Sequence, residues 1–259
     1  MAIKYNKANN KIKKLEKHLT DKIRKRVYSF DLPAGRSCPS AHLCKARAIL
    51  DSATGKRSVK DGPFTVFRCY AASDEARFSA TYETRKANFE ALVGLSSEEM
   101  ADTLHNALPL DAGIVRVHTS GDFFNSEYFY AWVEVARRNP DVIFYAYTKE
   151  LQYLVPSNSS VYYGSTGKSS NLRLTASRGG RQDHLIGEYG LPESVVVYST
   201  EEAESKGLEI DDDDSHAMLQ DGNTSFALLI HGTQPRGSEA GKAVYAIRKG
   251  GVTINAKVV

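Results

Sequence analysis

Five short runs rich in β-branched and aromatic residues fill the second half of the chain, and each ends in a polar or glycine-rich turn. They lie at 113–118, 142–147, 171–177, 194–200 and 225–230. A helical segment at 126–138, which ends at Asn139-Pro140, separates the first two runs. Strands that alternate with helices are typical of βα units. We therefore predict an α/β fold with a mostly parallel sheet. Because the later connections are less helical, we expect an open sheet or a partial barrel.

Helical stretches are expected before the first of these strands. Residues 71–93 are polar and compatible with a helix. Ser96 is expected to cap a further helix, because Glu98 and Glu99 would fall in its first turn, where acidic groups suit the helix dipole. These helices would lie between a loop-rich segment and the first strand of the sheet.

Positive charge is concentrated at the N-terminus. The chain as a whole has a formal net charge of +3, yet residues 1–26 hold ten Lys and Arg against two acidic residues. The apolar residues that recur there at helical spacing are Ile12, Leu15, Leu19 and Ile23. We predict an amphipathic helix with a cationic outer face. This helix would either dock on the body of the protein or contact nucleic acid through residues 4–26.

The length of 259 residues suits a basic arm at 1–27 followed by a single α/β domain at 28–259, which carries the cysteines in its 30–70 segment. No apolar run approaches the roughly 20 residues that a membrane-spanning helix needs. The first residues lack the apolar segment of a secretory signal. We therefore expect a cytoplasmic protein without membrane contact. The acidic cluster at 211–214 is expected to be a solvated loop, with a divalent-cation site as the alternative.

The three cysteines are the first place to look for chemistry, because an odd number does not suit a secreted disulfide framework. Five residues separate Cys38 from Cys44, and another 24 separate Cys44 from Cys69. A zinc finger would need four ligands in two close pairs, and a thioredoxin motif would have two intervening residues. Three thiolates are one short of the four that saturate a [4Fe–4S] cluster. Such a site would leave one iron open to a substrate, water or a non-cysteine ligand.

Other interpretations of the cysteines stay open on spacing alone. His42 could complete a zinc site with the three cysteines, although it lies between two of them. The thiols could also be structural, or one of them could be a nucleophile. The basic residues around them would lower thiol pKa values and partly neutralise a cluster. These residues are Arg36, Lys45, Arg47 and Arg68.

Functional groups are also concentrated in the turns that follow the predicted strands. In chain order they are His118, Asp122, Lys149, Ser177, Arg178 and His231. Ligands of parallel sheets bind beyond the carboxyl ends of the strands, where such turns converge. We predict a catalytic group of His118, Asp122, Lys149 and Ser177, in which His and Asp exchange protons and Lys149, with Arg178, holds an anion. Taken singly, each residue could simply cap a turn.

Several short motifs in this region occur together. They are Leu-Pro-Ala-Gly-x-x-Cys-Pro-x-Ala-x-x-Cys at 32–44, Asp-Gly-Pro at 61–63, Phe-Arg-Cys-Tyr-Ala-Ala-Ser at 67–73, Arg-Lys-x-Asn-Phe at 85–89, Val-Arg-x-His-x-Ser-Gly-Asp-Phe-Phe at 115–124, Phe-x-x-Trp-x-x-Val-Ala at 129–136 and Phe-Tyr-Ala-Tyr-Thr-Lys at 144–149. In this combination, over roughly 28–180, the chain resembles the phage "gene product 88" family. The resemblance implies a virus-encoded protein that acts in the cytoplasm of a bacterial host. It also makes Cys38, Cys44 and Cys69 part of a family pattern, which favours the cluster.

The leading expectation is thus an iron–sulfur protein with a [4Fe–4S] cluster on Cys38, Cys44 and Cys69. An open iron fits a lyase-type or desulfuration-type enzyme better than a pure electron carrier, with a small molecule or a modified nucleic acid as substrate. The alternative is a zinc-stabilised protein that binds nucleic acid through the basic arm.

Overall fold

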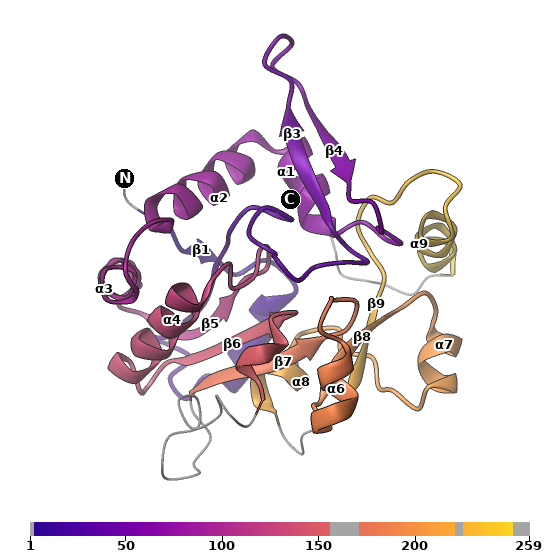
Figure 1. Cartoon of the computed structure of the whole chain (residues 1–259). Helices are drawn as coiled ribbons and strands as arrows, with labels where there is room; N and C mark the ends of the chain where they lie inside the picture. Colours follow the sequence, from indigo (N-terminus) through magenta and orange to yellow (C-terminus); the bar gives the residue numbers. More distant parts are fainter. Residues whose placement is uncertain (1–2, 156–170, 221–224, 251–259) are drawn as a thin grey trace.

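The computed structural model describes residues 3–155, 171–220 and 225–250, and it contains an open, curled, mostly parallel sheet (Figure 1). The seven strands lie in the order β1-β2-β5-β6-β7-β8-β9. Their bounds are β1 (Asn6–Lys7), β2 (Arg26–Phe30), β5 (Ala112–Val117), β6 (Ile143–Thr148), β7 (Leu172–Ser177), β8 (Glu193–Val197) and β9 (Phe226–Leu229). Every neighbouring pair is parallel except β1 and β2. The predicted fold class is confirmed, and all five predicted strands are present.

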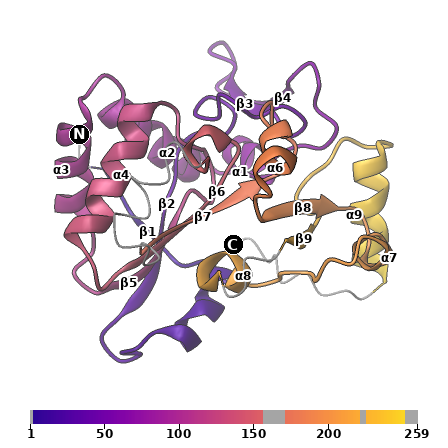
Figure 2. The same cartoon turned by 60° about the horizontal axis from the view of Figure 1, so that its bottom comes forward.

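Helices cover one face of the sheet (Figure 2). Helix α3 (Ser97–Ala107) and helix α4 (Ser126–Arg138) bury their apolar sides against alternate residues of β5, β6 and β7. The predicted helix at 126–138 is confirmed to the residue, and Asn125 caps it by accepting a hydrogen bond from the Tyr128 N–H at 2.9 Å. Ser96 forms the expected cap of α3, as a capping box with Glu99.

The predicted helical stretch at 71–93 is two helices, α1 (Tyr70–Arg77) and α2 (Ser79–Leu92). They are separate because Phe78 adopts an extended backbone between them. The remaining helices of the described residues are α6 (His184–Tyr189), α7 (Thr200–Ser205), α8 (Ser215–Leu219) and α9 (Glu239–Lys249), with the short 3-10 helices η1 (Ile12–His18) and η2 (Leu151–Tyr153).

The basic arm docks on the other face of the sheet. Ile12 and Leu15 of η1, with Leu19, are buried against Ile114 and Tyr145 and against α8. The expected amphipathic helix is therefore shorter than predicted, and the expectation for Ile23 is wrong, since its side chain is 84% exposed. The chain leaves the helix at Leu19 and turns, and Asp21 accepts the backbone N–H groups of the turn.

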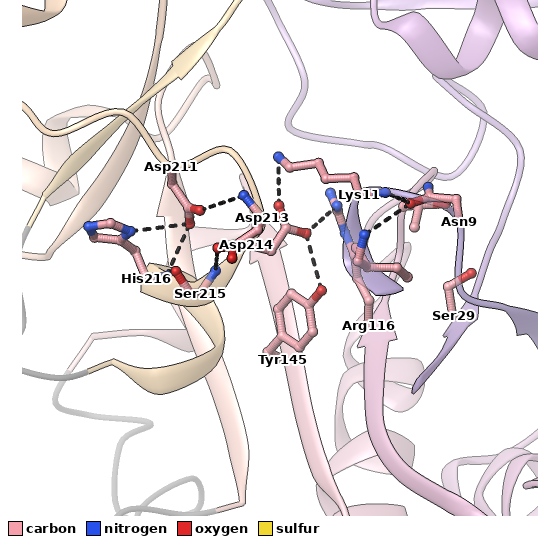
Figure 3. A network of polar contacts seen from close by, with 12 residues as sticks. Asn9, Lys11, Ser29, Arg116, Tyr145, Asp211, Asp213, Asp214, Ser215 and His216 are labelled. Atoms are coloured by element: carbon pink, nitrogen blue, oxygen red, sulfur yellow. Dashed lines mark hydrogen bonds and ion pairs between the residues drawn. The ribbon is translucent and has the colours of Figure 1, made fainter. Parts of the chain in front are cut away.

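The acidic cluster at 211–214 is not the solvated loop that the sequence suggested. Asp211, Asp213 and Asp214 are buried. Lysines of the arm form ion pairs with three residues of the 211–214 cluster, at 2.7–2.8 Å: Lys11 with Asp214, Lys14 with Asp212, and Lys17 with Asp213. Asp214 also pairs with Arg116 of β5 and accepts a hydrogen bond from the Tyr145 hydroxyl at 3.1 Å (Figure 3). The ion pairs hold the arm against the sheet.

The cysteine segment forms a lobe beside the sheet. Between the second and third cysteines, a two-stranded antiparallel hairpin of β3 (Ala46–Leu50) and β4 (Arg57–Asp61) projects from the body of the protein (Figure 1). Its base packs on α1, where Ala46, Ala71 and Ala72 are buried together.

We expect Asp214→Asn to destabilise the chain by about 3–5 kcal/mol, because it leaves the buried charge of Arg116 without its partner. Asp212→Asn is the matched control, and its effect should stay below about 1 kcal/mol because the Asp212 side chain is 68% exposed. Urea unfolding at pH 7 measures both free energies of unfolding. Equal effects would show that Asp214 does not anchor the arm.

The ion pair between Asp214 and Arg116 also predicts that the stability of the fold depends on pH. The Arg116 and Lys11 charges lower the pKa of Asp214 to about 2, against a burial effect in the opposite direction. A depressed pKa contributes stability above the unfolded value of 3.8, and this contribution is lost as the pH falls towards 2. The difference in the free energy of unfolding between the wild type and Asp214→Asn should therefore become smaller below about pH 4. A difference in the free energy of unfolding that stays constant down to pH 2 would contradict the lowered pKa of Asp214.

Candidate functional site

The cysteine segment lies over the carboxyl ends of the parallel strands. The backbone N–H of Leu32, which follows β2, donates to the carbonyl of Ser120, which follows β5, at 2.9 Å. Ala41 forms an isolated bridge with Gly180, and the Leu43 N–H donates to the Gly179 carbonyl at 3.0 Å. The turns after β2, β5 and β7 are thus joined by one stretch of chain that carries Cys38 and Cys44. This is the edge at which ligands of parallel sheets bind.

Glycine at 121 permits this close packing. Gly121 has a φ of 96°, and a Cβ atom there would stand 2.7 Å from both Leu32 Cβ and Ser37 Oγ. Any other residue would push the cysteine segment away from the turn after β5, and it would strain the backbone as well.

Asp122 is buried in this turn and is surrounded by donors. Its carboxylate accepts hydrogen bonds from the Thr148 hydroxyl at 2.6 Å, the Lys149 N–H at 2.9 Å and the Phe123 N–H at 2.8 Å. Burial nevertheless raises its pKa to about 7. Asp122 also raises the pKa of Cys38 electrostatically, which places the carboxylate and that thiol in one neighbourhood. A buried carboxyl with such a pKa can hold or release a proton near neutrality.

Lys149 and Ser177 are brought together, as predicted. The Lys149 ammonium donates to the Ser177 hydroxyl at 2.7 Å and to the carbonyls of Ser177 and Arg178, each at 3.1 Å. The next residue, Glu150, accepts hydrogen bonds from the Ser40 N–H at 2.7 Å and from its hydroxyl at 2.9 Å. The end of β6 therefore ties the cysteine segment to the end of β7.

The structure places three other predicted residues differently. The buried His118 ring points into the aromatic core, where Nε2 lies 2.9 Å from the Tyr128 hydroxyl, and burial lowers its pKa to about 3. With this pKa the imidazole gains a proton only well below neutral pH, which does not favour the proton exchange expected of it. Arg178 forms an ion pair with Glu193. The His231 ring packs on the Tyr70 ring with a centroid distance of 4.6 Å, and burial lowers its pKa to about 4.

The three cysteines are free, partly buried thiols. Burial raises the pKa of Cys38 well above its usual range, and Cys69 and Cys44 add to the effect. Burial and then Cys44 raise the pKa of Cys69 to about 12. The backbone N–H groups of Gly35 and Ala71 act in the opposite direction by donating to the Cys38 and Cys69 sulfur atoms. The three thiols thus share one electrostatic environment.

Two buried residues of this edge were not predicted from the sequence. Glu75 accepts hydrogen bonds from the Ala34 N–H at 2.9 Å and from the Ser120 hydroxyl at 3.2 Å, and it forms an ion pair with Arg85 at 3.0 Å. Arg85 also donates to the Ala71 carbonyl at 3.1 Å. Arg85 begins the Arg-Lys-x-Asn-Phe motif at 85–89, and this motif was the sequence signal that could have identified it. Glu75 lies in none of the motifs.

No set of three or more His, Cys, Asp or Glu residues within the described ranges is arranged to hold a metal ion. His42 stacks on Phe64, with ring centroids 4.6 Å apart. The zinc alternative therefore gains no support from the geometry of the described chain.

The family model described as "Gene product 88" matches residues 3–249, which is nearly the whole chain. This chain belongs to the gene product 88 family. The match extends through β8, β9 and α9, beyond the motifs at 32–149, so the C-terminal part of the sheet belongs to the family unit as well. No solved structure matches the chain.

Two curated relatives of this gene product 88 chain are phage proteins, which confirms the expectation of a phage protein. The chain is 37% identical over 132 residues to the "Gene 88 protein" of Mycobacterium phage L5, covering 47% of each chain. It is 34% identical over 157 residues to the "Gene 88 protein" of Mycobacterium phage D29, covering 56% of this chain and 54% of the relative. The chain thus spans about half the length of the curated relatives it matches. Among the helices that the structure describes, none has the length and apolar character to span a bilayer.

Because burial raises its pKa, Asp122 should bind a proton in the folded chain between about pH 4 and 7, where the unfolded chain has released it. Because the folded chain binds more protons than the unfolded chain there, the contribution of Asp122 lowers the free energy of unfolding as the pH rises from about 4 to 7. Carboxyl ¹³C NMR of the metal-free protein should show one Asp that titrates near pH 7. The resonance should be absent in Asp122→Asn, and a titration near pH 4 would refute the assignment.

Proposed function

We propose that this gene product 88 protein binds a [4Fe–4S] cluster through Cys38, Cys44 and Cys69 and leaves one iron open. The observation that carries the proposal is the set of three free thiols in one electrostatic environment, on a segment held over the carboxyl edge of the sheet. Clusters of this type are held by cysteine thiolates.

The surroundings of the thiols fit such a group. Buried thiols with raised pKa values stay protonated unless a positive centre neutralises the thiolates, and the irons of a cluster supply that charge. The N–H groups of Gly35 and Ala71 already face two of the sulfurs, and hydrogen bonds to sulfur tune clusters. In a cubane each cysteine binds a different iron, so its ligands stand further apart than those of one ion.

The groups at the carboxyl edge of the sheet support an enzymatic function. A bound cluster with an open iron supplies a Lewis acid that polarises a substrate oxygen or sulfur. Asp122 holds a proton near neutral pH, and its carboxylate raises the pKa of Cys38. Lys149 fixes the turn after β7 through Ser177, so its ammonium positions that turn. These groups suit elimination, hydration or desulfuration, and the reaction would take place in the cytoplasm of the host cell.

The alternative of a zinc protein that binds nucleic acid through the arm has less support. Lys11, Lys14 and Lys17 of the arm already pair with aspartates of the same chain. Three of the ten cations that the sequence offered for phosphates are therefore neutralised within the fold.

Anaerobic purification followed by an absorption spectrum and by iron, sulfide and zinc analysis tests the cluster. We expect a brown protein with about four irons and four sulfides per chain. The variants Cys38→Ser, Cys44→Ser and Cys69→Ser should each lose most of the iron. Ser52→Ala, in the exposed turn of the β3–β4 hairpin, is the control and should keep all of it.

Circular dichroism of each cysteine variant separates loss of the cluster from loss of the fold. A folded cysteine variant that keeps full iron would overturn the three-cysteine site. A colourless wild-type protein with about one zinc would overturn the cluster itself.

A further inference from the structure

A pocket of about 390 Å³ lies beside α9, apart from the group of Asp122 and Lys149. Loop 232–237 and the exposed side of the helix form its walls. Its cationic lining residues are Arg236, Lys242 and Arg248, and the Tyr245 ring also contributes to the lining. The volume is within the range of small-molecule sites.

The positive charge of this pocket is largely unpaired. In the part of the chain that the structure describes, Arg236 and Arg248 take part in no ion pair, while Lys242 pairs with Glu239 at 2.7 Å. Both members of that pair are mostly exposed, so the pair is weak and water competes with it. The lining residues include no Asp or Glu. The pocket therefore favours an anionic ligand.

An aromatic ring stands among these cations. Tyr245 is 61% exposed, and Lys249 lies over its ring at 5.0 Å from the centroid. A large exposed ring next to arginines supplies a stacking platform beside phosphate-binding groups, which is the combination that binds single-stranded nucleic acid. Inorganic phosphate or an acidic peptide would use the cations but not the ring.

The pocket is fastened to the segment that carries Cys69. The Gln234 side chain accepts a hydrogen bond from the Arg68 N–H at 2.7 Å and donates to the Arg68 carbonyl at 3.0 Å. Ser73 donates to the Thr233 carbonyl at 3.2 Å, and Phe67 packs against the buried side of α9. A chain-like ligand that leaves the pocket on this side therefore meets the cysteine segment.

A second exposed ring lies in that segment. Phe64, which follows β4, is 59% exposed and stacks on His42. The loop after β4 turns towards α9 (Figure 1). A strand of several nucleotides has a second base to offer the Phe64 ring, whereas a free mononucleotide has only one base.

We propose that the pocket beside α9 binds single-stranded nucleic acid, with one phosphate on Arg236, another on Arg248 and a base on Tyr245. The proposal does not depend on a bound cluster, because the residues that carry it belong to α9 and to the loop before it. It also assigns nucleic-acid contact to a different surface from the basic arm.

Fluorescence anisotropy of labelled oligo(U) and oligo(dT) of roughly 12 nucleotides tests the proposal on the full chain, with and without iron. We expect salt-dependent binding. The double variant Arg236→Glu and Arg248→Glu should weaken it at least tenfold and reduce the slope of log affinity against log salt by about 1.4, because two phosphate contacts are lost. Tyr245→Ala should weaken it roughly tenfold.

The matched control is the double variant Lys13→Glu and Lys22→Glu, which makes the same change of charge on exposed arm residues. We expect its affinity to stay within twofold of the wild type. All changed side chains are exposed, and circular dichroism verifies the fold. Three results would each overturn the proposal: loss of binding only in the arm variant, no binding by the wild type, or displacement of the strand by an equal nucleotide concentration of UMP or dTMP. Cluster content, measured on the same samples, reports separately on the cysteine site.

Discussion

Buried carboxylates that accept backbone N–H groups hold the edge of the sheet together. Asp31 accepts the Thr119 N–H at 2.7 Å, Glu75 that of Ala34, Asp122 that of Lys149, and Glu150 that of Ser40. Where parallel strands end, the following N–H groups lose their ladder partners, and each would be costly to bury unpaired. A carboxylate that lies across from the neighbouring turn satisfies the donor and fixes the distance between the two loops. The placement of the cysteine segment depends on these four acids.

The opposite face of the sheet is stabilised in a related way, but with cations. Along β5, Val115 and Val117 face the helices, so the alternation of the strand sends Arg116 to the face that the arm covers. A buried guanidinium needs a partner, and Asp214 supplies it from a loop at the far end of the chain. The arm then adds Lys11 to the same carboxylate (Figure 3). The acidic loop and the basic arm are thus two halves of one structural contact, and this explains why their charges are so unevenly distributed along the sequence.

Local patterns predicted the elements well, because periodicity, caps and Pro residues act within one segment. The five strands and α4 follow from such signals. The ion-pair partners of the charged residues could not be predicted, because Lys14 and Asp212 are 198 residues apart and no local rule connects them. At the site, the prediction that turns converge held for Asp122, Lys149 and Ser177. It did not distinguish His118, whose positive φ of 73° goes with a ring that lies in the aromatic core. Spacing places a residue in a turn but does not fix its backbone conformation.

Contacts between the residues beside Cys69 and the loop before α9 link the two proposed sites. Gly232 has a φ of 81°, and a Cβ there would lie 2.6 Å from Tyr70 Cβ, so the chain after β9 passes directly against the start of α1. The Tyr70 hydroxyl donates in turn to the Thr119 carbonyl at 2.5 Å, in the turn after β5. Tyr70 follows Cys69 directly in the chain, so these contacts also bring the loop close to the cysteine at the start of α1. Tyr70 therefore connects the loop before α9 to the turn after β5, with the loop backbone packed against the residue and the Thr119 carbonyl at its hydroxyl.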